Sequence, residues 1–175
     1  YDITTVLVEY PLMPEVSMDQ LVASCNTAFK WVQKNILQYN GDPELLYIAG
    51  HSAGGHLATM MMTNPENKSN AFKGVCALSG FFNLLPVQLS ELNDILQMDA
   101  ATAERNSPVQ LTPVVIFPLL LAVGADESDE FKDQSTELYN RWNKQVPVQL
   151  IEPAGLNHFS ILEAFSDKST DLHKA

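Results

Sequence analysis

The sequence has little cysteine and little positive charge. Its two cysteines among 175 residues, Cys25 and Cys76, have no second Cys or His at metal-ligand spacing. We therefore expect two small buried thiols in a reducing compartment, and neither a disulfide framework nor a metal site. The 10 Lys and Arg residues stand against 21 Asp and Glu, which gives a net charge of −11. Such an acidic surface repels phosphate groups, so we expect neither nucleic acid nor an anionic membrane as a partner.

Long hydrophobic runs are also lacking. The longest, residues 114–123, contains Pro118 and is about ten residues long, whereas a membrane-spanning helix needs about 20. The chain shows no basic segment followed by an apolar one at its start, as a signal peptide would. We therefore expect a cytoplasmic protein. The chain opens on Tyr1 instead of Met, so we expect the natural protein to begin earlier.

Short apolar segments alternate with longer amphipathic ones along the chain. This alternation predicts an α/β fold, with a mostly parallel sheet covered by helices on both faces. Ser17 is the expected N-cap of the first long helix. The expected strands are residues 3–10, 45–49, 74–78, 114–123 and 146–151, and the expected helices are residues 18–38, 56–63, 127–144 and 159–165.

Residues 81–113 interrupt this alternation. They have an irregular pattern, with short helical patches around residues 89–96 and 100–105. Long excursions between strands of α/β enzymes often carry substrate-binding elements. We therefore expect residues 81–113 to form a cap or part of a substrate pocket.

The segment Gly50-His51-Ser52-Ala53-Gly54 matches the pattern G-x-S-x-G, directly after an expected strand and directly before an expected helix. This is the setting of a nucleophile elbow, a tight turn that exposes a serine hydroxyl at the edge of a sheet. Bulky side chains two residues before and after Ser52 would clash, which explains glycine at both positions. The free N–H groups of the following helix can bind a developing oxyanion.

A serine hydroxyl needs a base to take its proton. Of the four histidines, His158 follows the last expected strand, at the sheet edge where Ser52 emerges. His51 adjoins Ser52 on the sharp turn and is expected to be structural. His56 lies on the next helix and His173 in a polar tail. We therefore predict His158 as the general base.

The base needs a carboxylate to fix its tautomer. Asp126 ends the fourth expected strand at the same edge and is the predicted partner. The order Ser, Asp, His along the chain is the order found in α/β-hydrolases. The competing carboxylates are Glu127, Asp129, Glu130 and Asp133, of which the last three are expected on a solvated helix.

With these residues in place, the chain resembles the α/β-hydrolase superfamily and, within it, the esterase and kynurenine formamidase (arylformamidase) group. The resemblance implies a triad of Ser52, Asp126 and His158, with the backbone N–H of Ala53 in the oxyanion hole. It departs from the family at Pro11, where Arg is usual, and at Asn83, where Asp is usual. The similar segments are residues 10–15, 50–58, 78–84, 107–108, 123–126 and 156–159.

One family motif is missing from this sequence. The family carries a His-Gly-Gly segment that supplies part of the oxyanion hole, and no His-Gly-Gly occurs here. In the family's sheet, the strand before this motif lies between the strands matching residues 3–10 and 45–49. The resemblance therefore implies that residues 1–175 are the C-terminal portion of an α/β-hydrolase domain, with a gap or exposed edge beside residues 45–49.

These expectations combine into a serine hydrolase that cleaves a small carboxylic ester or an N-formyl amide through an acyl-enzyme. Phe81 and Phe82 are the expected substrate-binding side chains. The expected partners are a small-molecule ester or formamide and a second copy in a homodimer, and we expect no cofactor and no metal. The alternative is a non-catalytic binding module or an inactive fragment that kept the elbow.

Overall fold

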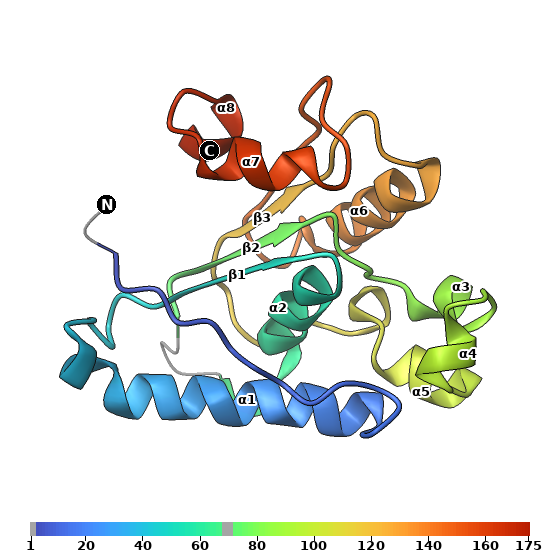
Figure 1. The fold of residues 1–175 in the computed structure, drawn as a ribbon, viewed down its shortest axis with the longest axis horizontal. Helices are drawn as coiled ribbons and strands as arrows, with labels where there is room; N and C mark the ends of the chain where they lie inside the picture. Colours follow the sequence, from blue (N-terminus) through green and yellow to red (C-terminus); the bar gives the residue numbers. More distant parts are fainter. Residues whose placement is uncertain (1–2, 68–71) are drawn as a thin grey trace.

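The computed structural model describes residues 3–67 and 72–175. Its centre is a parallel sheet in which the spatial order of the strands follows their order in the chain (Figure 1). The register aligns the carboxyl ends, with His51 beside Leu78, Leu78 beside Ala122 and Ala122 beside Ile151. The loops that follow the strands therefore leave from one edge of the sheet. The strands are β1 (Tyr47–His51), β2 (Gly74–Leu78), β3 (Leu119–Ala122) and β4 (Val148–Ile151).

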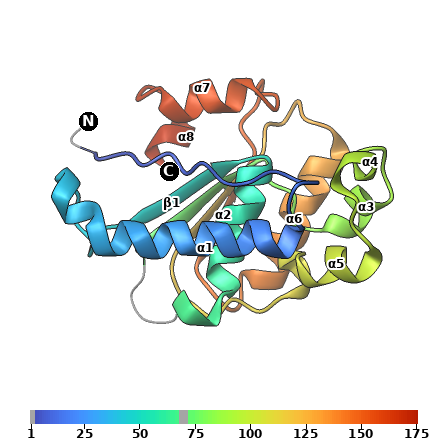
Figure 2. The same ribbon diagram turned by 60° about the horizontal axis from the view of Figure 1, so that its bottom comes forward.

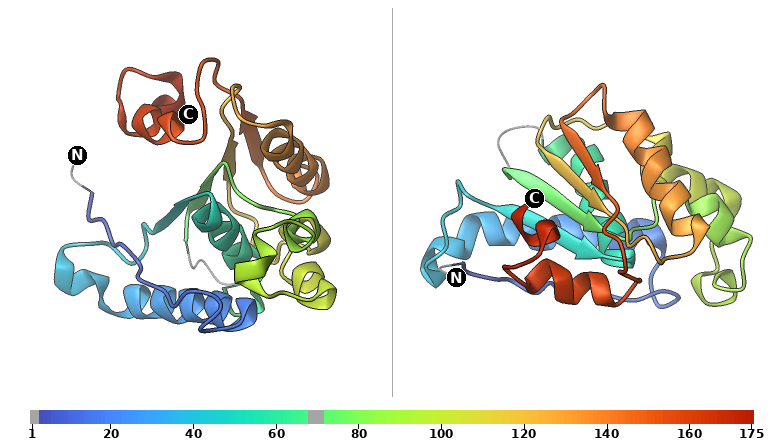
Figure 3. Two further views of the ribbon diagram at one scale, coloured as in Figure 1. Left: turned by 45° about the vertical axis from the view of Figure 1, so that its right-hand side comes forward. Right: turned by 90° about the horizontal axis from the view of Figure 1, so that it is seen from above.

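Helices cover both faces of this sheet, as the two views of Figure 3 show. Alternate residues of a strand point to opposite faces, so Val75 and Ala77 pack in the main core with α1, α2 and α6, while Leu78 packs with α7 and α8. This arrangement confirms the expected α/β class. The helices are α1 (Met18–Asn35), α2 (Ala53–Thr63), α3 (Leu84–Gln88), α4 (Asn93–Leu96), α5 (Ala100–Arg105), α6 (Asp129–Trp142), α7 (Ser160–Ser166) and α8 (Asp171–Lys174).

The local signals in the sequence act where they were expected. Ser17 caps α1 through a capping box, in which its hydroxyl accepts the N–H of Gln20 and the side chain of Gln20 accepts the N–H of Ser17. Such a box satisfies two donors that the helix start leaves unpaired.

The strand expected at residues 114–123 is shorter than predicted, because only Leu119–Ala122 pairs with β2 and β4.

The strand expected at residues 3–10 is wrong. These residues form an irregular segment that runs alongside α1 (Figure 2), and Leu7 is 91% exposed. A strand needs a neighbour for its backbone hydrogen bonds, and β1 is the edge of the described sheet. A pocket of about 270 Å³ separates the segment from β1 and is lined by Val6, Tyr10 and Ile48 among others.

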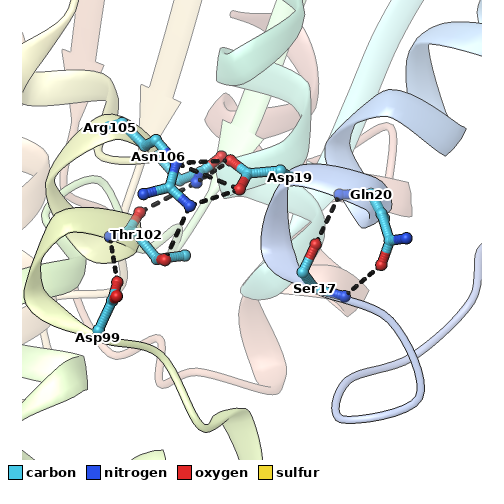
Figure 4. A network of polar contacts seen from close by, with 7 residues as sticks. All are labelled: Ser17, Asp19, Gln20, Asp99, Thr102, Arg105 and Asn106. Carbon is cyan, nitrogen blue, oxygen red and sulfur yellow. Dashed lines mark hydrogen bonds and ion pairs between the residues drawn. The ribbon is translucent and has the colours of Figure 1, made fainter.

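The excursion between β2 and β3 contains α3, α4 and α5, and polar contacts hold it at its start and at the end of α5. At its start, the Gln134 side-chain oxygen accepts the N–H groups of Phe82 and Asn83, at 2.6 and 2.9 Å. At the end of α5, the Arg105 guanidinium bonds to the carboxylate of Asp19 on α1, with a closest approach of 2.6 Å (Figure 4). The excursion is therefore held against α1 and α6.

Candidate active site

Ser52 occupies the sharp turn between β1 and α2. Its φ of 56° and ψ of −118° are sterically costly for a residue with a side chain. The backbone holds this conformation through the Ser52 N–H, which donates to the carbonyl of Leu78 on β2 at 2.9 Å. The predicted elbow is therefore present, with Ser52 at the carboxyl edge of the sheet.

Close backbone contacts explain glycine at positions 50 and 55 of this turn, whereas the clash expected at Gly54 does not occur among the described residues. A Cβ on Gly50 would lie 2.1 Å from the carbonyl oxygen of Gly54, so no side chain fits there. A Cβ on Gly54 would meet no described heavy atom within 4 Å, so the clash expected there is absent from the described structure. The second tight position is Gly55, where a Cβ would lie 2.9 Å from the Cα of Gly80.

Ala53 is the first residue of α2 and is exposed. The N–H groups in the first turn of a helix have no carbonyl four residues earlier within the helix. The Ala53 N–H is therefore available for an external acceptor beside Ser52. The positive end of the dipole of the 11-residue helix α2 lies at the same place.

Glu127 and His158 form a polar pair at the same sheet edge. Nδ1–H of His158 donates to Oε2 of Glu127 at 2.8 Å. The Glu127 side chain is 1% exposed, and its Oε1 accepts two further bonds, from the Ser79 hydroxyl at 2.6 Å and from the Gly124 N–H at 2.7 Å. A buried charge is tolerated when it is hydrogen-bonded in this way. With the proton on Nδ1, His158 keeps Nε2 free as a base.

Asp126 does not hold this position. It is exposed, and its N–H donates to the carbonyl of Leu156 at 2.9 Å. The turn after β3 is closed by the Glu127 N–H, which donates to the carbonyl of Gly124 at 3.0 Å, and it directs the next side chain, that of Glu127, inward. The expected contact between Asp126 and His158 is therefore not made, and Glu127 bonds to His158 instead. The sequence offered no cue for this one-residue difference beyond the presence of Glu127 among the competing carboxylates.

Gly124 lets the loop that carries His158 approach the end of β3. A Cβ on Gly124 would lie 2.1 Å from the carbonyl oxygen of Leu156. The contact is a backbone contact, so neither side can yield by a rotation of a side chain. Glycine at position 124 therefore sets how closely His158 comes to Glu127.

His51, which we expected to have only a structural role, lies in contact with His158. Its Nε2–H donates to the backbone carbonyl of His158 at 2.7 Å, and the two imidazole rings have their centroids 4.5 Å apart. Burial lowers the pKa of His51, which favours the neutral ring. Phe131 packs on His158 at 4.5 Å. His158 is therefore held by a hydrogen bond at Nδ1, a hydrogen bond at its backbone carbonyl and ring contacts with His51, Phe131 and Phe159.

Ser52 and His158 share the sheet edge without a direct bond. Among the residues that the structure describes, no hydrogen bond joins the Ser52 hydroxyl to His158. The link between them runs through His51, which precedes Ser52 in the chain and bonds to the His158 carbonyl. Bonds between a nucleophile and its base often tighten only when substrate is present.

The two predicted substrate-binding phenylalanines lie in different places. Phe82 is 0% exposed within the main core, so the expectation that it touches a ligand is corrected. Phe81 lines a cavity of about 330 Å³ that also reaches Ala53. Its ring centroid lies 4.9 Å from that of Phe131. Phe81 therefore stands between this cavity and the ring that packs on His158.

His56, Cys25 and Cys76 take no part in the hydrogen bonds described at this edge. His56 is buried, its Nε2–H donates to the carbonyl of Asn106 at 2.7 Å, and burial lowers its pKa to about 4. Cys25 and Cys76 are free and partly buried, and burial raises the pKa of each thiol, to about 11 and 12. In the described part of the chain, no three His, Cys, Asp or Glu residues come together to hold a metal ion. Residues 3–67 and 72–175 include no helix that is both long and apolar enough to cross a bilayer.

The sequence is similar to that of known α/β-hydrolase-fold proteins. Residues 1–115 match a protein family described as alpha/beta hydrolase fold. Kynurenine formamidase from Salmo salar is 30% identical over 175 residues, which cover 94% of this chain and 58% of that protein. Kynurenine formamidase from Danio rerio is also 30% identical, over 97% of this chain and 59% of that protein. The chain thus spans less than two thirds of these relatives.

Solved structures show the same architecture. A structure described as a putative thioesterase from Silicibacter sp. superposes with a TM-score of 0.79 at 27% identity, covering 93% of this chain and 60% of that one. A thermostable carboxylesterase from a metagenomic library superposes with a TM-score of 0.72 at 19% identity, covering 87% and 59%. At that lower identity the likeness concerns the fold alone.

Proposed function

The chain belongs to the α/β-hydrolase family, and from this premise we propose that it is a serine hydrolase. Its substrate is a small carboxylic ester or an N-formyl amide. Ser52 is the nucleophile, His158 the general base and Glu127 the carboxylate that orients His158. The kynurenine formamidases similar to this chain support the formamide class, and cleavage of a small ester uses the same acyl-enzyme chemistry.

In the first step, the Ser52 oxygen attacks the carbonyl carbon of the substrate while Nε2 of His158 takes the hydroxyl proton. The bond between carbon and the leaving oxygen or nitrogen then breaks. His158 returns the proton to that leaving group, which departs as an alcohol or an amine. Ser52 is left as an ester of the acyl group, and His158 is neutral again.

In the second step, a water molecule takes the place of the leaving group. His158 accepts a proton from the water as its oxygen attacks the acyl carbon, and gives that proton to the Ser52 oxygen as the ester bond breaks. The products are a carboxylic acid and the free serine. Each proton taken by His158 is returned within the same step, so the cycle needs no oxidant, metal or cofactor.

Two features lower the barrier of both steps. The Ala53 N–H at the start of α2 donates to the oxyanion, a contribution of the kind worth roughly 100–1000-fold in rate. Glu127 stabilises the imidazolium of His158 while it holds the proton.

The buried pair of Glu127 and His158 carries this proposal. The Glu127 side chain is 1% exposed and accepts bonds from an imidazole, a hydroxyl and a backbone N–H. Burying such a carboxylate costs desolvation energy, which apolar residues would avoid if the role were purely structural. Glu127 follows β3, two strands from β1 and the elbow, and His158 lies on a loop that is bonded to His51. Both side chains thus lie at the sheet edge that carries Ser52, as a proton relay to Ser52 requires.

The test is hydrolysis of p-nitrophenyl acetate and of N-formylkynurenine, compared between the wild-type protein and Ser52→Ala. The proposal expects turnover of at least one substrate, a burst of p-nitrophenol that matches the enzyme concentration, and loss of both in Ser52→Ala. Turnover that survives in Ser52→Ala contradicts the site. No turnover by the full-length protein favours the alternative of a non-catalytic binding module.

A further inference from the structure

The cavity beside Ala53 has no part in the reaction steps above. Its volume of about 330 Å³ lies at the lower end of the range for ligand sites. Four parts of the chain line it: the segment before α1, the start of α1, the start of α2 and the excursion with α3 and α4. The wall residues that matter here are Met13, Met18, Phe81, Leu84, Leu92 and Leu96.

The walls of this cavity are apolar. Apart from Tyr10 and His56, every lining residue is Leu, Met, Val, Ile, Phe or Ala. The Nε2–H of His56 is already bonded to the carbonyl of Asn106. A wall of flexible Met and Leu side chains adapts to a hydrocarbon chain, and beside it the described lining adds only the Tyr10 hydroxyl as a further polar side-chain group, too few partners for an amino acid or a sugar. The chemistry therefore favours an aliphatic group.

The position of the cavity decides which half of the substrate enters it. The leaving group must face His158, which gives it a proton. The cavity reaches Ala53, while His158, Glu127 and Phe131 are not among its lining residues. Phe81 forms the wall on that side, with its ring 4.9 Å from Phe131. The half of the substrate that points away from His158 is the acyl half.

We propose that this cavity binds the aliphatic chain of the acyl group, so that the enzyme prefers esters of butanoic to octanoic acid over acetyl esters and formamides. The inference rests on the proposed function for the reaction, and it adds the class of acyl group. A formyl or acetyl group would leave the cavity empty, and would gain nothing from its apolar walls.

Hydrolysis of p-nitrophenyl esters of increasing chain length tests this assignment. Each methylene that leaves water for the cavity is expected to raise kcat/KM about fourfold, from acetate through butyrate to hexanoate. Leu92 lines the cavity and is 51% exposed at its surface, so Leu92→Trp can fill the cavity without disturbing the core. This variant should lower the ratio of hexanoate to acetate kcat/KM by about tenfold or more.

Leu89→Trp is the matched control. Leu89 lies on the same excursion, is 83% exposed and does not line the cavity. It should leave the wild-type chain-length preference unchanged. A flat chain-length profile in the wild-type protein, or equal ratios in Leu92→Trp and Leu89→Trp, overturns the inference.

Binding to Ser52→Ala separates this inference from the proposed reaction. The esters stay intact in that variant under the proposed mechanism, so their Kd values can be measured by titration calorimetry. The inference expects Kd to fall from acetate to hexanoate, and expects Leu92→Trp in the Ser52→Ala background to remove the difference. If the wild-type protein hydrolyses nothing while this trend holds, the cavity stands and the reaction fails. Equal Kd values for both esters contradict the cavity even if the enzyme is active.

Discussion

Replacement of Glu127 by Gln separates charge and tautomer from packing, because the structure dictates how the new amide must lie. Oε1 of Glu127 accepts the backbone N–H of Gly124 at 2.7 Å, and that donor cannot turn away. The amide oxygen of Glu127→Gln must therefore take the Oε1 position, where it also keeps the bond from Ser79. Its NH₂ group then faces Nδ1 of His158.

A donor at that position forces Nδ1 of His158 to accept, which moves the imidazole proton to Nε2. The ring then cannot take the proton of Ser52, and loss of this tautomer costs about 10⁴-fold in kcat in a serine triad. All buried polar atoms stay paired, so we expect the thermal midpoint to change by less than about 4 °C, the shift that goes with about 1 kcal/mol in a domain of this size. Loss of activity without loss of stability is the signature of a positioning role.

Asp126→Asn is the matched control, because it makes the same chemical change one residue earlier on an exposed side chain. The assay is kcat for p-nitrophenyl acetate, with thermal unfolding of each variant measured in parallel. We expect Asp126→Asn to keep at least half of the wild-type kcat, roughly the effect of a surface change. A Glu127→Gln protein with near-normal kcat, or a large loss in Asp126→Asn, would refute the assignment of the carboxylate.

Three further outcomes are expected, two from contacts at this sheet edge and one from the buried His56. His51→Phe keeps the ring packing but loses the 2.7 Å bond to the carbonyl of His158, so kcat should fall about tenfold with KM unchanged, and His51→Gln, which can still donate, should recover part of it. His56 has a folded-state pKa of about 4, below the ordinary histidine pKa of 6.5 because the ring is buried, so the unfolded chain binds its proton first as the pH falls. The free energy of unfolding measured with urea should therefore be full above pH 6.5 and fall by about 3 kcal/mol towards pH 4, and His56→Gln should lose this component. Gly124→Ala places a Cβ 2.1 Å from a loop carbonyl, so kcat should fall about 100-fold through displacement of His158, and a normal kcat would show that the close approach is not needed.

Much of this arrangement could be predicted from local sequence signals. The turn residues 50–55 lie between an apolar strand and a helix, and this pattern alone placed Ser52 at the sheet edge. The expected strands at residues 74–78 and 146–151 appear as β2 and β4, because β2 is buried on both faces and the apolar residues of the edge strand β4 pack, half-buried, against the cores on the two faces. His158 followed from its place after the last strand.

Two features depended on contacts that no local pattern encodes. Whether Asp126 or Glu127 turns inward is decided by the bond that closes the turn after β3 and by the donors of Ser79 and Gly124, which come from another strand and from the backbone. Residues 3–10 have the composition of a buried strand, yet a strand forms only where a neighbour supplies hydrogen bonds. In the described structure β1 is paired on one side only, with β2.

The role of residues 81–113 was predicted only in outline. Their irregular pattern indicated a cap, and the structure places Phe81, Leu84 and Leu92 from this segment in the wall of the cavity. Phe82, adjacent to Phe81, is buried in the core instead. As at residues 126 and 127, neighbouring side chains face opposite ways. The backbone N–H groups of Phe82 and Asn83 donate to the side-chain oxygen of Gln134, which lies on a helix distant in the sequence.

The most direct test of the central claim, that Ser52 is a nucleophile activated by His158 and Glu127, is covalent labelling with a fluorophosphonate, followed by mass spectrometry of the peptides. We expect one phosphonate per chain, on Ser52, with labelling abolished in Ser52→Ala and strongly slowed in His158→Ala and Glu127→Gln. An unlabelled Ser52 in the full-length protein, or labelling at another residue that persists in Ser52→Ala, would contradict it.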